Sequence, residues 1–329
     1  MDVSGKILGA LLAVVFGVLG AMAVFWILNK LVELLPPKWE ERLKPYAFLL
    51  PAFSVITLFL LYPAVTTVYA SVLNDDSTAF VGVKNYTRLF SNDPFLSALL
   101  NNLLWIIVVP ASVVAFGLLV AVLADRMSPR KEKLAKSVIF LPMAISMVGA
   151  STIWKFIYDY KPAGTNQIGL LNALVVAFGG QPQTWLQFET LRFNTFLLMI
   201  VYIWTQVGYA MVLLSAAIKA VPDDTIEAGR IDGASEVAIF FRIIVPQAWP
   251  TVITVFITVL IGVMKVFDIV YAMTNGQFNT DVIGNAFFNA TYFEGDRGKA
   301  SAIVVILMVA IIPVMVYQVR QFRAQEANR

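Results

Sequence analysis

A stripe of polar and aromatic side chains runs along one face of an otherwise apolar segment. Tyr202, Thr205, Gln206 and Tyr209 follow at i, i+3, i+4 and i+7, the spacing of one helix face, and Trp204 lies beside them. Hydroxyl and amide groups can hydrogen-bond sugar hydroxyls, and aromatic rings can stack on the apolar faces of sugars. Polar side chains also join helices to each other inside membranes. The residues alone leave both interpretations open.

Most other chemistry is excluded by what the sequence lacks. The 329 residues include no cysteine and no histidine, which excludes disulfides, thiolate chemistry, imidazole bases and imidazole metal ligands. A G-x-x-x-x-G-K-[ST] phosphate loop is also missing, since Gly5-Lys6 and Gly298-Lys299 lack the preceding glycine and the following Ser or Thr. No nucleophile–base pair or cluster of metal ligands stands out. We therefore predict a chain with no catalytic site, metal or cofactor of its own.

The elements that must position the stripe are membrane helices. Hydrophobic residues make up 59% of the chain against 14% charged residues, and the mean hydropathy of +0.77 is typical of a protein in a lipid bilayer. Seven stretches reach the length of about 20 mostly apolar residues that a membrane helix needs. They are Ile7–Asn29, Pro45–Asn74, Pro94–Ala124, Ser137–Trp154, Phe193–Ile218, Ile243–Met264 and Ala300–Val319. We predict an all-α integral membrane protein with about seven transmembrane helices.

Two further features refine these spans. The sixth span is expected to continue past Lys265 towards Ala272. An eighth uncharged run, Pro162–Phe188, is interrupted by Gly, Asn, Gln and Pro. Its apolar part, Leu170–Phe178, is too short to cross a bilayer and predicts a small helix in an external loop.

The distribution of Lys and Arg gives the orientation. Alternate loops hold fifteen of these residues on one side and eight on the other, and the richer side is cytoplasmic. This predicts a multi-pass plasma membrane protein with its N-terminus outside and its C-terminus in the cytoplasm. Ala21-Met22-Ala23 could end a cleaved signal sequence, but the apolar run continues to Leu28. Cleavage would also place the basic segment Lys30–Lys44 outside, against the charge distribution.

One predicted cytoplasmic loop, Lys219–Pro250, has the pattern of two short helices. Asp223 and Asp224 start the first helix, where the helix dipole favours acidic residues, and Gly233 ends it. The second helix restarts at Ser235 and is expected to end at Pro246 and Pro250. One apolar face is formed by residues at i, i+3, i+4 and i+7: Val237, Phe240, Phe241 and Ile244. Such helices either fill a groove in another protein or lie on the lipid headgroups.

Residues 227–246 carry a more specific signal. They read Glu227-Ala228-Gly229, three residues, Gly233, nine residues, Ile243, one residue, Val245-Pro246. This closely resembles the EAA motif of permease subunits in binding-protein-dependent ABC importers, a cytoplasmic loop written E-A-A, three residues, G, nine residues, I, one residue, L-P. Gly229 and Val245 depart from the motif, but both keep a small or apolar side chain. The resemblance favours a docking role over a helix that lies on lipid.

The resemblance covers about residues 45–320 and extends to the carbohydrate-uptake branch, similar to the maltose and α-glucoside permease subunits. A short loop, Asp75–Asp93, stands where the larger maltose subunit has a long extracytoplasmic insertion. The segments that carry the likeness besides the motif are Ala220–Asp224, Phe140–Pro142, Phe267-Asp268 and Thr274–Gly276. We therefore expect an N-terminal helix with a connector at 1–44, a permease core at 45–320 and a cytoplasmic tail at 321–329.

Partners and a mechanism are implied by this resemblance. The expected partners are a second permease subunit, two ATPase subunits that bind ATP and Mg, and an extracytoplasmic solute-binding protein. Glu227 would pair with a basic group on the ATPase, although an ion pair with Arg230 is the alternative. Gly233 would allow the bend between the two short helices. The expected ATPase-coupling residues are Glu227, Ala228, Gly229, Asp232, Gly233, Phe240, Phe241 and Pro246.

A role for the polar stripe is also implied, because its positions match the sugar-contacting face of the larger maltose subunit. The expected substrate-binding residues are Tyr202, Trp204, Thr205, Gln206 and Tyr209. Five other matching positions are apolar where that subunit is mostly polar: Met143, Met147, Val259, Val263 and Val266. This argues against maltose itself and leaves a di- or oligosaccharide of another size or binding mode, with an α-glucoside preferred.

Lys265 and Asp268 lie three residues apart at the end of the sixth span. Intramembrane charges usually find partners, so we expect an ion pair on one helix face, with a gate contact by Asp268 as the alternative. A self-contained secondary transporter or channel would also show polar groups and charges in its spans. Such a protein would not need the loop at 219–250, which favours the importer subunit.

Overall fold

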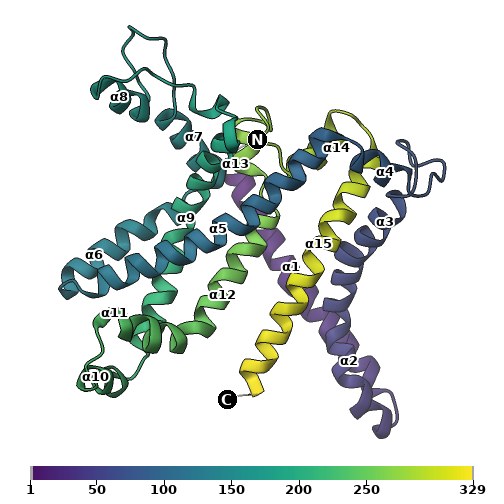
Figure 1. Cartoon of the computed structure of the whole chain (residues 1–329). Coiled ribbons are helices and arrows are strands. Elements are labelled where there is room, and N and C mark those ends of the chain that lie inside the picture. Colours follow the sequence, from purple (N-terminus) through teal and green to yellow (C-terminus); the bar gives the residue numbers. More distant parts are fainter. Residues whose placement is uncertain (1–2, 328–329) are drawn as a thin grey trace. The chain divides into compact units, whose positions relative to one another are not determined.

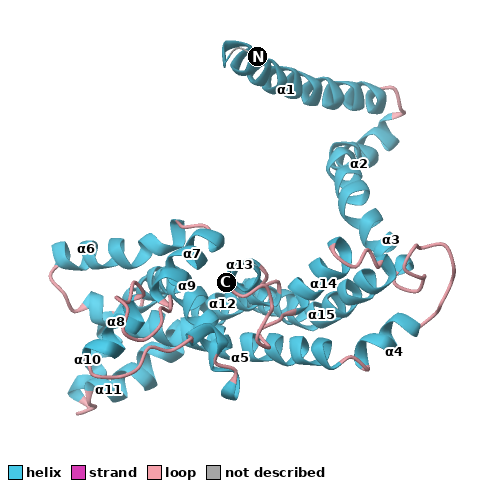
Figure 2. Cartoon of the chain, turned by 90° about the horizontal axis from the view of Figure 1, so that it is seen from above, coloured by secondary structure: helices cyan, strands magenta, loops and turns pink. Residues whose placement is uncertain are grey.

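The computed structural model describes residues 3–327, and there the chain consists of helices joined by turns and loops, with one isolated β-bridge between Leu73 and Phe80 (Figure 2). By its contacts the chain divides into two units, one ending at Tyr69 and one beginning at Ala70. The first unit holds α1 (Val3–Glu33), α2 (Pro37–Ile56) and most of α3 (Tyr62–Ala70).

The second unit contains the remaining helices. The first of these are α4 (Lys84–Phe90), α5 (Asp93–Asp125), α6 (Pro129–Phe140), α7 (Met147–Ile157), α8 (Leu170–Ala177) and α9 (Phe193–Lys219). They are followed by α10 (Asp223–Ile231), α11 (Glu236–Ile239), α12 (Val245–Met264), α13 (Asp268–Met273), α14 (Ile283–Tyr292) and α15 (Arg297–Ala327).

Six helical segments are long and apolar enough to cross a membrane, and a seventh span is formed if one bent pair is counted. This confirms the predicted all-α membrane fold. The described helices also confirm the small helix expected at Leu170–Phe178, which is α8, while its external location stays a prediction.

In the first unit, α1 packs against α2, and the rings of Phe25 and Phe48 stack with centroids 5.9 Å apart. The helix starting at Pro37 continues to Ala70 through a π-helical turn at Thr57–Leu61. The expected connector at Lys30–Lys44 is therefore mostly helical, with only a short break before Pro37. The predicted boundary at residue 44 stays a prediction.

The fourth predicted span is not one helix. α6 and α7 meet at a bend of 104°. Pro142 lies in a short 3₁₀ turn at Leu141–Ala144, and Ile145 and Ser146 are extended. The Ser146 hydroxyl then accepts a hydrogen bond from the Gly149 backbone N–H at 3.1 Å and caps α7. A proline without an N–H followed by a serine cap explains why the apolar run turns instead of crossing straight.

Close helix contacts build the core of the second unit around α9. A Cβ placed on Gly117 of α5 would lie 2.6 Å from the Ala210 Cβ on α9, and one on Gly208 of α9 would lie 2.5 Å from the Ile139 carbonyl oxygen on α6. Small residues thus let the three backbones touch, as they do in many membrane helix pairs. Trp105 on α5 is fully buried and meets the Tyr202 ring edge-on at 6.1 Å.

The two ends of this unit hold different elements. α10 and α11 lie together at one end, whereas α7, α8, α13 and α14 lie towards the other (Figure 1). α9 connects the two ends without interruption, since it is helical from Phe193 to Lys219. The predicted coupling loop and the predicted outer loops are therefore separated by the length of the membrane helices.

Candidate coupling loop and solute site

In the loop that carries the EAA-like motif, the chain turns at Gly233 between the two short helices. The Gly233 N–H donates to the Arg230 carbonyl at 3.0 Å, and the Ala234 N–H donates to the Gly229 carbonyl at 3.0 Å. This pair of bonds ends α10 in a Schellman motif, with Gly233 left-handed at a φ of 78°. The predicted break at Gly233 is confirmed. Ser235 caps the next helix by accepting a hydrogen bond from the Ala238 N–H at 3.3 Å, as its sequence position predicts.

The second helix of the loop does not end where the prolines predicted. α11 passes through a π-helical turn at Phe240–Ile244 directly into α12, so helix runs unbroken from Glu236 to Met264. Pro246 directly follows the π-helical turn, and Pro250 lies four residues further on, so both prolines lie inside the continuous helix rather than at its end. The coupling loop is thereby joined to a membrane span by continuous helix.

Gly229 holds the two arms of the loop together. It is buried, and a Cβ at this position would lie 2.7 Å from the Ile243 Cδ1 atom. Ile239, beside it, is 1% exposed. Glycine in place of the motif's alanine therefore lets α10 approach the turn at 240–244 more closely than an alanine would.

The other motif residues present their side chains outwards. Glu227 is exposed and has no hydrogen bond or ion pair within the described chain, because Arg230 pairs with Glu236 instead at 2.9 Å. That pairing raises the pKa of the Arg230 guanidinium. Ala228 and Asp232 are also exposed. The intraloop pair considered as the alternative role of Glu227 is therefore not formed.

The second helix of the loop also exposes an apolar surface. Val237 and Phe241 are 67% and 64% exposed, and the Phe241 ring meets that of the half-buried Phe240 edge-on at 5.0 Å. A loop that exposes large apolar side chains together with an unpaired carboxylate has the features of a docking surface for a partner.

Some side chains of the polar stripe on α9 are buried against neighbouring groups, and others are partly open. Thr205 is 1% exposed and its hydroxyl donates to the Tyr202 carbonyl at 2.8 Å, so it is satisfied within its own helix. Trp204 meets Trp154 edge-on at 5.9 Å. Gln206 and Tyr209 are half-buried. Their proposed contact with a substrate stays a prediction.

Tyr202 is the stripe residue that reaches a cavity. A space of about 200 Å³ lies where α12 ends and α13 begins. The Tyr202 hydroxyl lies against α12, since a Cβ on Gly262 would be 2.4 Å from its oxygen. The lining consists of Met147, Tyr202, Gly262, Lys265, Val266, Phe267, Asp268 and Ile269. Two aromatic rings, two charged groups and apolar walls are a suitable lining for a polar solute with apolar faces.

Lys265 and Asp268 are on opposite sides of a helix break, not on one helix face. α12 ends at Met264, and α13 starts at Asp268 after an irregular turn. Both side chains are exposed, and the two form no ion pair with each other in the described structure. The expected pair and the expected continuation of the sixth span are therefore wrong, because the turn at 265–267 separates the two charges. A gate contact by Asp268 stays a prediction.

Comparison with known proteins identifies the family. Residues 113–325 match the model of binding-protein-dependent transport system inner membrane components. The alpha-glucoside transport system permease protein AglF of Rhizobium meliloti is 45% identical over 96% of this chain and 97% of its own. This chain belongs to the family of binding-protein-dependent transport system inner membrane components. GgtC of Synechocystis, an osmoprotective compounds uptake permease protein, is 46% identical over 86% of this chain and 100% of its own.

Solved structures agree with this family fold. A chain of a bacterial ABC transporter involved in import of the acidic polysaccharide alginate superposes with a TM-score of 0.73 at 20% identity, covering 86% of this chain and 98% of that chain. The recognition of an ABC importer permease from its EAA-like loop is confirmed. The chain is a membrane-spanning subunit of such an importer.

A charge network that sequence spacing did not reveal supports the coupling loop of this permease. The Lys136 ammonium donates to Asp125 at 2.6 Å, to Glu132 at 2.7 Å and to the Ser215 hydroxyl. Lys219, the last residue of α9, binds Glu132 as well and lies 3.5 Å from Asp125. The bonds join the ends of α5, α6 and α9 directly before α10. These residues are up to 94 positions apart, so no local pattern links them.

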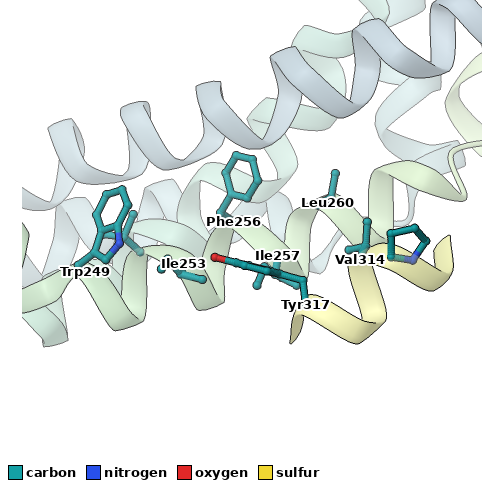
Figure 3. A pocket seen from close by; sticks show the side chains of 9 residues that line it. Trp249, Ile253, Phe256, Ile257, Leu260, Val314 and Tyr317 are labelled. Carbon is teal, nitrogen blue, oxygen red and sulfur yellow. The ribbon is translucent and has the colours of Figure 1, made fainter. Parts of the chain in front are cut away.

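Two further cavities of the permease differ in chemistry. One of about 590 Å³ lies between α12 and α15 and is lined almost entirely by apolar side chains, with Trp249, Phe256 and Tyr317 among them (Figure 3). It offers few groups that could bind a sugar hydroxyl. The other, of about 650 Å³, is polar and lies beside Arg192, which donates to Asn101 Oδ1 at 2.7 Å and to Ser97 at 3.1 Å.

Proposed function

We propose that this permease is one of two membrane subunits of an ATP-driven importer for a di- or oligosaccharide, with α-glucosides as the preferred class. The support for the substrate class is the relative AglF, whose name specifies alpha-glucosides, together with the aromatic and polar lining of the cavity at Tyr202. A more distant relative, from Thermococcus litoralis, is a trehalose/maltose permease protein with 27% identity over 84% of this chain and 92% of its own.

The observation that carries the coupling role is a loop with its turn fixed at Gly233 that exposes both an unpaired carboxylate, Glu227, and a large apolar ring, Phe241. In this proposal two ATPase subunits bind ATP and Mg and hydrolyse the ATP. A groove of one of them binds the loop, with a basic group facing Glu227. A solute-binding protein delivers the sugar outside, and a second permease subunit completes the pathway. ATP-driven closure of the ATPase pair shifts the loop, and the helices alternate between inward and outward access.

Reconstitution of the complete complex tests this coupling. We expect wild-type proteoliposomes to take up an α-glucoside only with ATP and the binding protein. Glu227→Ala should lower both uptake and the ATPase activity stimulated by the binding protein by about 10-fold or more, because it removes one partner of a desolvated charge pair. Glu236→Ala is the matched control, since that carboxylate bonds within the loop. Equal, small effects of both substitutions would contradict the docking role.

The orientation is part of the proposal and has its own test. Because the chain contains no cysteine, a single introduced cysteine reports its side of the membrane without background. Ile231 in the coupling loop and Phe178 in the loop after α8 are 86% and 89% exposed. We expect a membrane-impermeant maleimide added outside intact cells to label Phe178→Cys and to leave Ile231→Cys unlabelled. The reverse pattern would overturn the assignment of a cytoplasmic coupling loop.

A further inference from the structure

Five aromatic side chains form a continuous row across α13 and α14. Phe267, directly before α13, contacts Tyr271 with ring centroids at 5.1 Å and Phe288 at 5.2 Å. Tyr271 and Phe288 are 4.9 Å apart. Phe288 then meets Tyr292 at 4.7 Å and Phe293 at 6.0 Å. Both helices lie at the end of the unit opposite the coupling loop (Figure 1).

The row is open to its surroundings along much of its length. Tyr292 and Phe293 are 69% and 70% exposed, and Tyr271 is 38% exposed. The opposite side of α14 is buried instead, with Ile283 at 4% and Ala290 at 0% in a cluster with residues of α15. α14 therefore has a packed apolar side and an aromatic side without a covering element in the described chain.

One end of the row is part of the solute cavity. Phe267 lines the space of about 200 Å³ together with Tyr202 and Asp268. From there the rings lead through Phe288 to Tyr292, away from the cavity. The row and the cavity thus form one continuous surface.

The charges beside the row indicate a watery surface rather than lipid. Lys265 and Asp268 are both exposed, and neither side chain has a hydrogen bond or ion pair in the described structure. Unpaired charged groups are costly in hydrocarbon, whereas aromatic rings beside water and charge are typical of sugar-binding surfaces. A band of rings at the membrane interface would explain the aromatics but not these two open charges.

We propose that Phe267, Tyr271, Phe288, Tyr292 and Phe293 form an aromatic track that binds successive glucosyl rings of an oligosaccharide outside the cavity at Tyr202. This inference rests on the proposed glycoside substrate and deepens it. The apolar C–H faces of the sugar stack on the rings, while its hydroxyls face water and the neighbouring charges. A longer sugar covers more of the track, so its transport depends more strongly on the outer rings.

The test uses this dependence on length. The complete complex in proteoliposomes is given ATP, its binding protein, and maltose or maltotriose as the probe. The double substitution Tyr292→Ala with Phe293→Ala removes the outer rings, which lie on the surface. We expect the ratio of maltotriose to maltose uptake to fall by about 3-fold to 10-fold, the effect of one or two ring contacts. Tyr292→Phe keeps the ring and should keep the ratio.

Controls separate a track from a structural role. Phe178→Ala removes a ring that is 89% exposed in a different loop, and it should leave the ratio unchanged. If the double variant lowers uptake of both sugars equally, or changes neither, the rings are structural or contact lipid, and the track is overturned while the glycoside importer stands. If the wild-type complex transports neither maltose nor maltotriose, the track is overturned, and uptake of trehalose by the same proteoliposomes then decides whether the α-glucoside class stands.

Discussion

The coupling loop at 219–250 and the outer loop between α13 and α14 are held in place by different means. The coupling loop is closed by bonds between residues that are close in sequence, such as Gly233 to Arg230. The outer loop is held by distant residues: Asn101 of α5 donates to the carbonyls of Asn279 and Asp281, both at 2.7 Å. Asn194 of α9 donates to the Phe278 carbonyl at 2.7 Å. One loop keeps its shape by itself, and the other depends on the assembled helix bundle.

The outer loop also contains strained backbone. Asn275, Phe278 and Asn279 all have positive φ values near 55°, and none of them is glycine. Such conformations cost about 1–3 kcal/mol each and persist only where the surroundings enforce them. The buried amides of α5 and α9 supply that enforcement. The coupling loop, which is held by local bonds, is suited to move as a rigid body with a partner. The outer loop, which is held by the helix bundle, is suited to form a fixed surface.

The largest effect is expected from a substitution at the turn of the coupling loop. Gly233→Pro requires a φ near −65° where the chain has 78°, and it removes the N–H that donates to Arg230. The protein should still insert and assemble, but uptake should fall by about 10-fold or more relative to ATP hydrolysis, because the arms of the loop lose their fixed angle at a cost of about 3 kcal/mol. Gly233→Asn, which tolerates a left-handed backbone, is the control. Unchanged uptake by the proline variant would contradict the role of this turn.

The second prediction addresses the tether of the outer loop. Asn101→Leu removes the donor to the Asp281 carbonyl and one acceptor of Arg192, and it leaves the Asn279 carbonyl with only the longer bond from Arg192 at 3.4 Å. We expect a loss of about 2–4 kcal/mol in the free energy of unfolding, seen as a lower melting temperature in detergent. Asn166→Leu, at an exposed loop position, should change the melting temperature little. Similar melting temperatures for both variants would show that the outer loop holds its own shape.

A third prediction concerns the packing inside the coupling loop. Gly229→Ala restores the alanine of the motif and lowers the backbone entropy of the unfolded chain, but its Cβ meets the Ile243 side chain. The two effects offset each other, so the single variant should change stability by less than about 1 kcal/mol. Adding Ile243→Val removes the Cδ1 atom, and a double-mutant cycle by thermal unfolding should then show favourable coupling. If the stability changes of the two substitutions simply add, the contact between residue 229 and the Ile243 Cδ1 atom has no effect on the stability of the loop.

The smallest effect is expected from the carboxyl of Asp281 in the outer loop. Burial raises its pKa above the ordinary value of 3.8, against the hydrogen bonds from Asn285 and the Val282 N–H, which lower it. A raised folded-state pKa favours the protonated group, so its stabilisation is full below the ordinary pKa and is lost as the pH rises through the folded value. Asp281→Asn should therefore raise the melting temperature by about 1–3 °C at pH 7 and by less near pH 3. An equal shift at both pH values would show that the titration of Asp281 has no part in stability.

The sequence predicted the features of the fold that are local. Length and apolar composition revealed the spans, and the glycine at 233 with the serine at 235 revealed the shape of the coupling loop. The end of that loop was misjudged, because the helix continues through a π-helical turn at Phe240–Ile244 and past Pro246 instead of stopping there. The bend after Pro142 was missed, because the predicted fourth span ran straight through it, and the cap at Ser146 depends on the extended backbone before it.

Features that depend on distant residues were not predictable from one sequence. The network around Lys136 joins three helix ends, and the amides of Asn101 and Asn102 in α5 bind the loop that leads to α14. Their partners are backbone groups about 180 residues away. Helical spacing predicted the stripe on α9. It did not predict which stripe side chains are hydrogen-bonded or packed and which are partly open, because this depends on the side chains of α6, α7 and α12 that face them.

The unbroken course of α9 has a mechanical consequence. Tyr202 and Lys219 are on the same rod, separated by about 26 Å at the rise of an α-helix. The backbone contacts at Gly117 and Gly208 prevent this rod from sliding along α5 or α6 without a clash. A displacement of the Lys219 end of this rod therefore also displaces Tyr202 and strains the close contacts that α9 makes with α5 and α6.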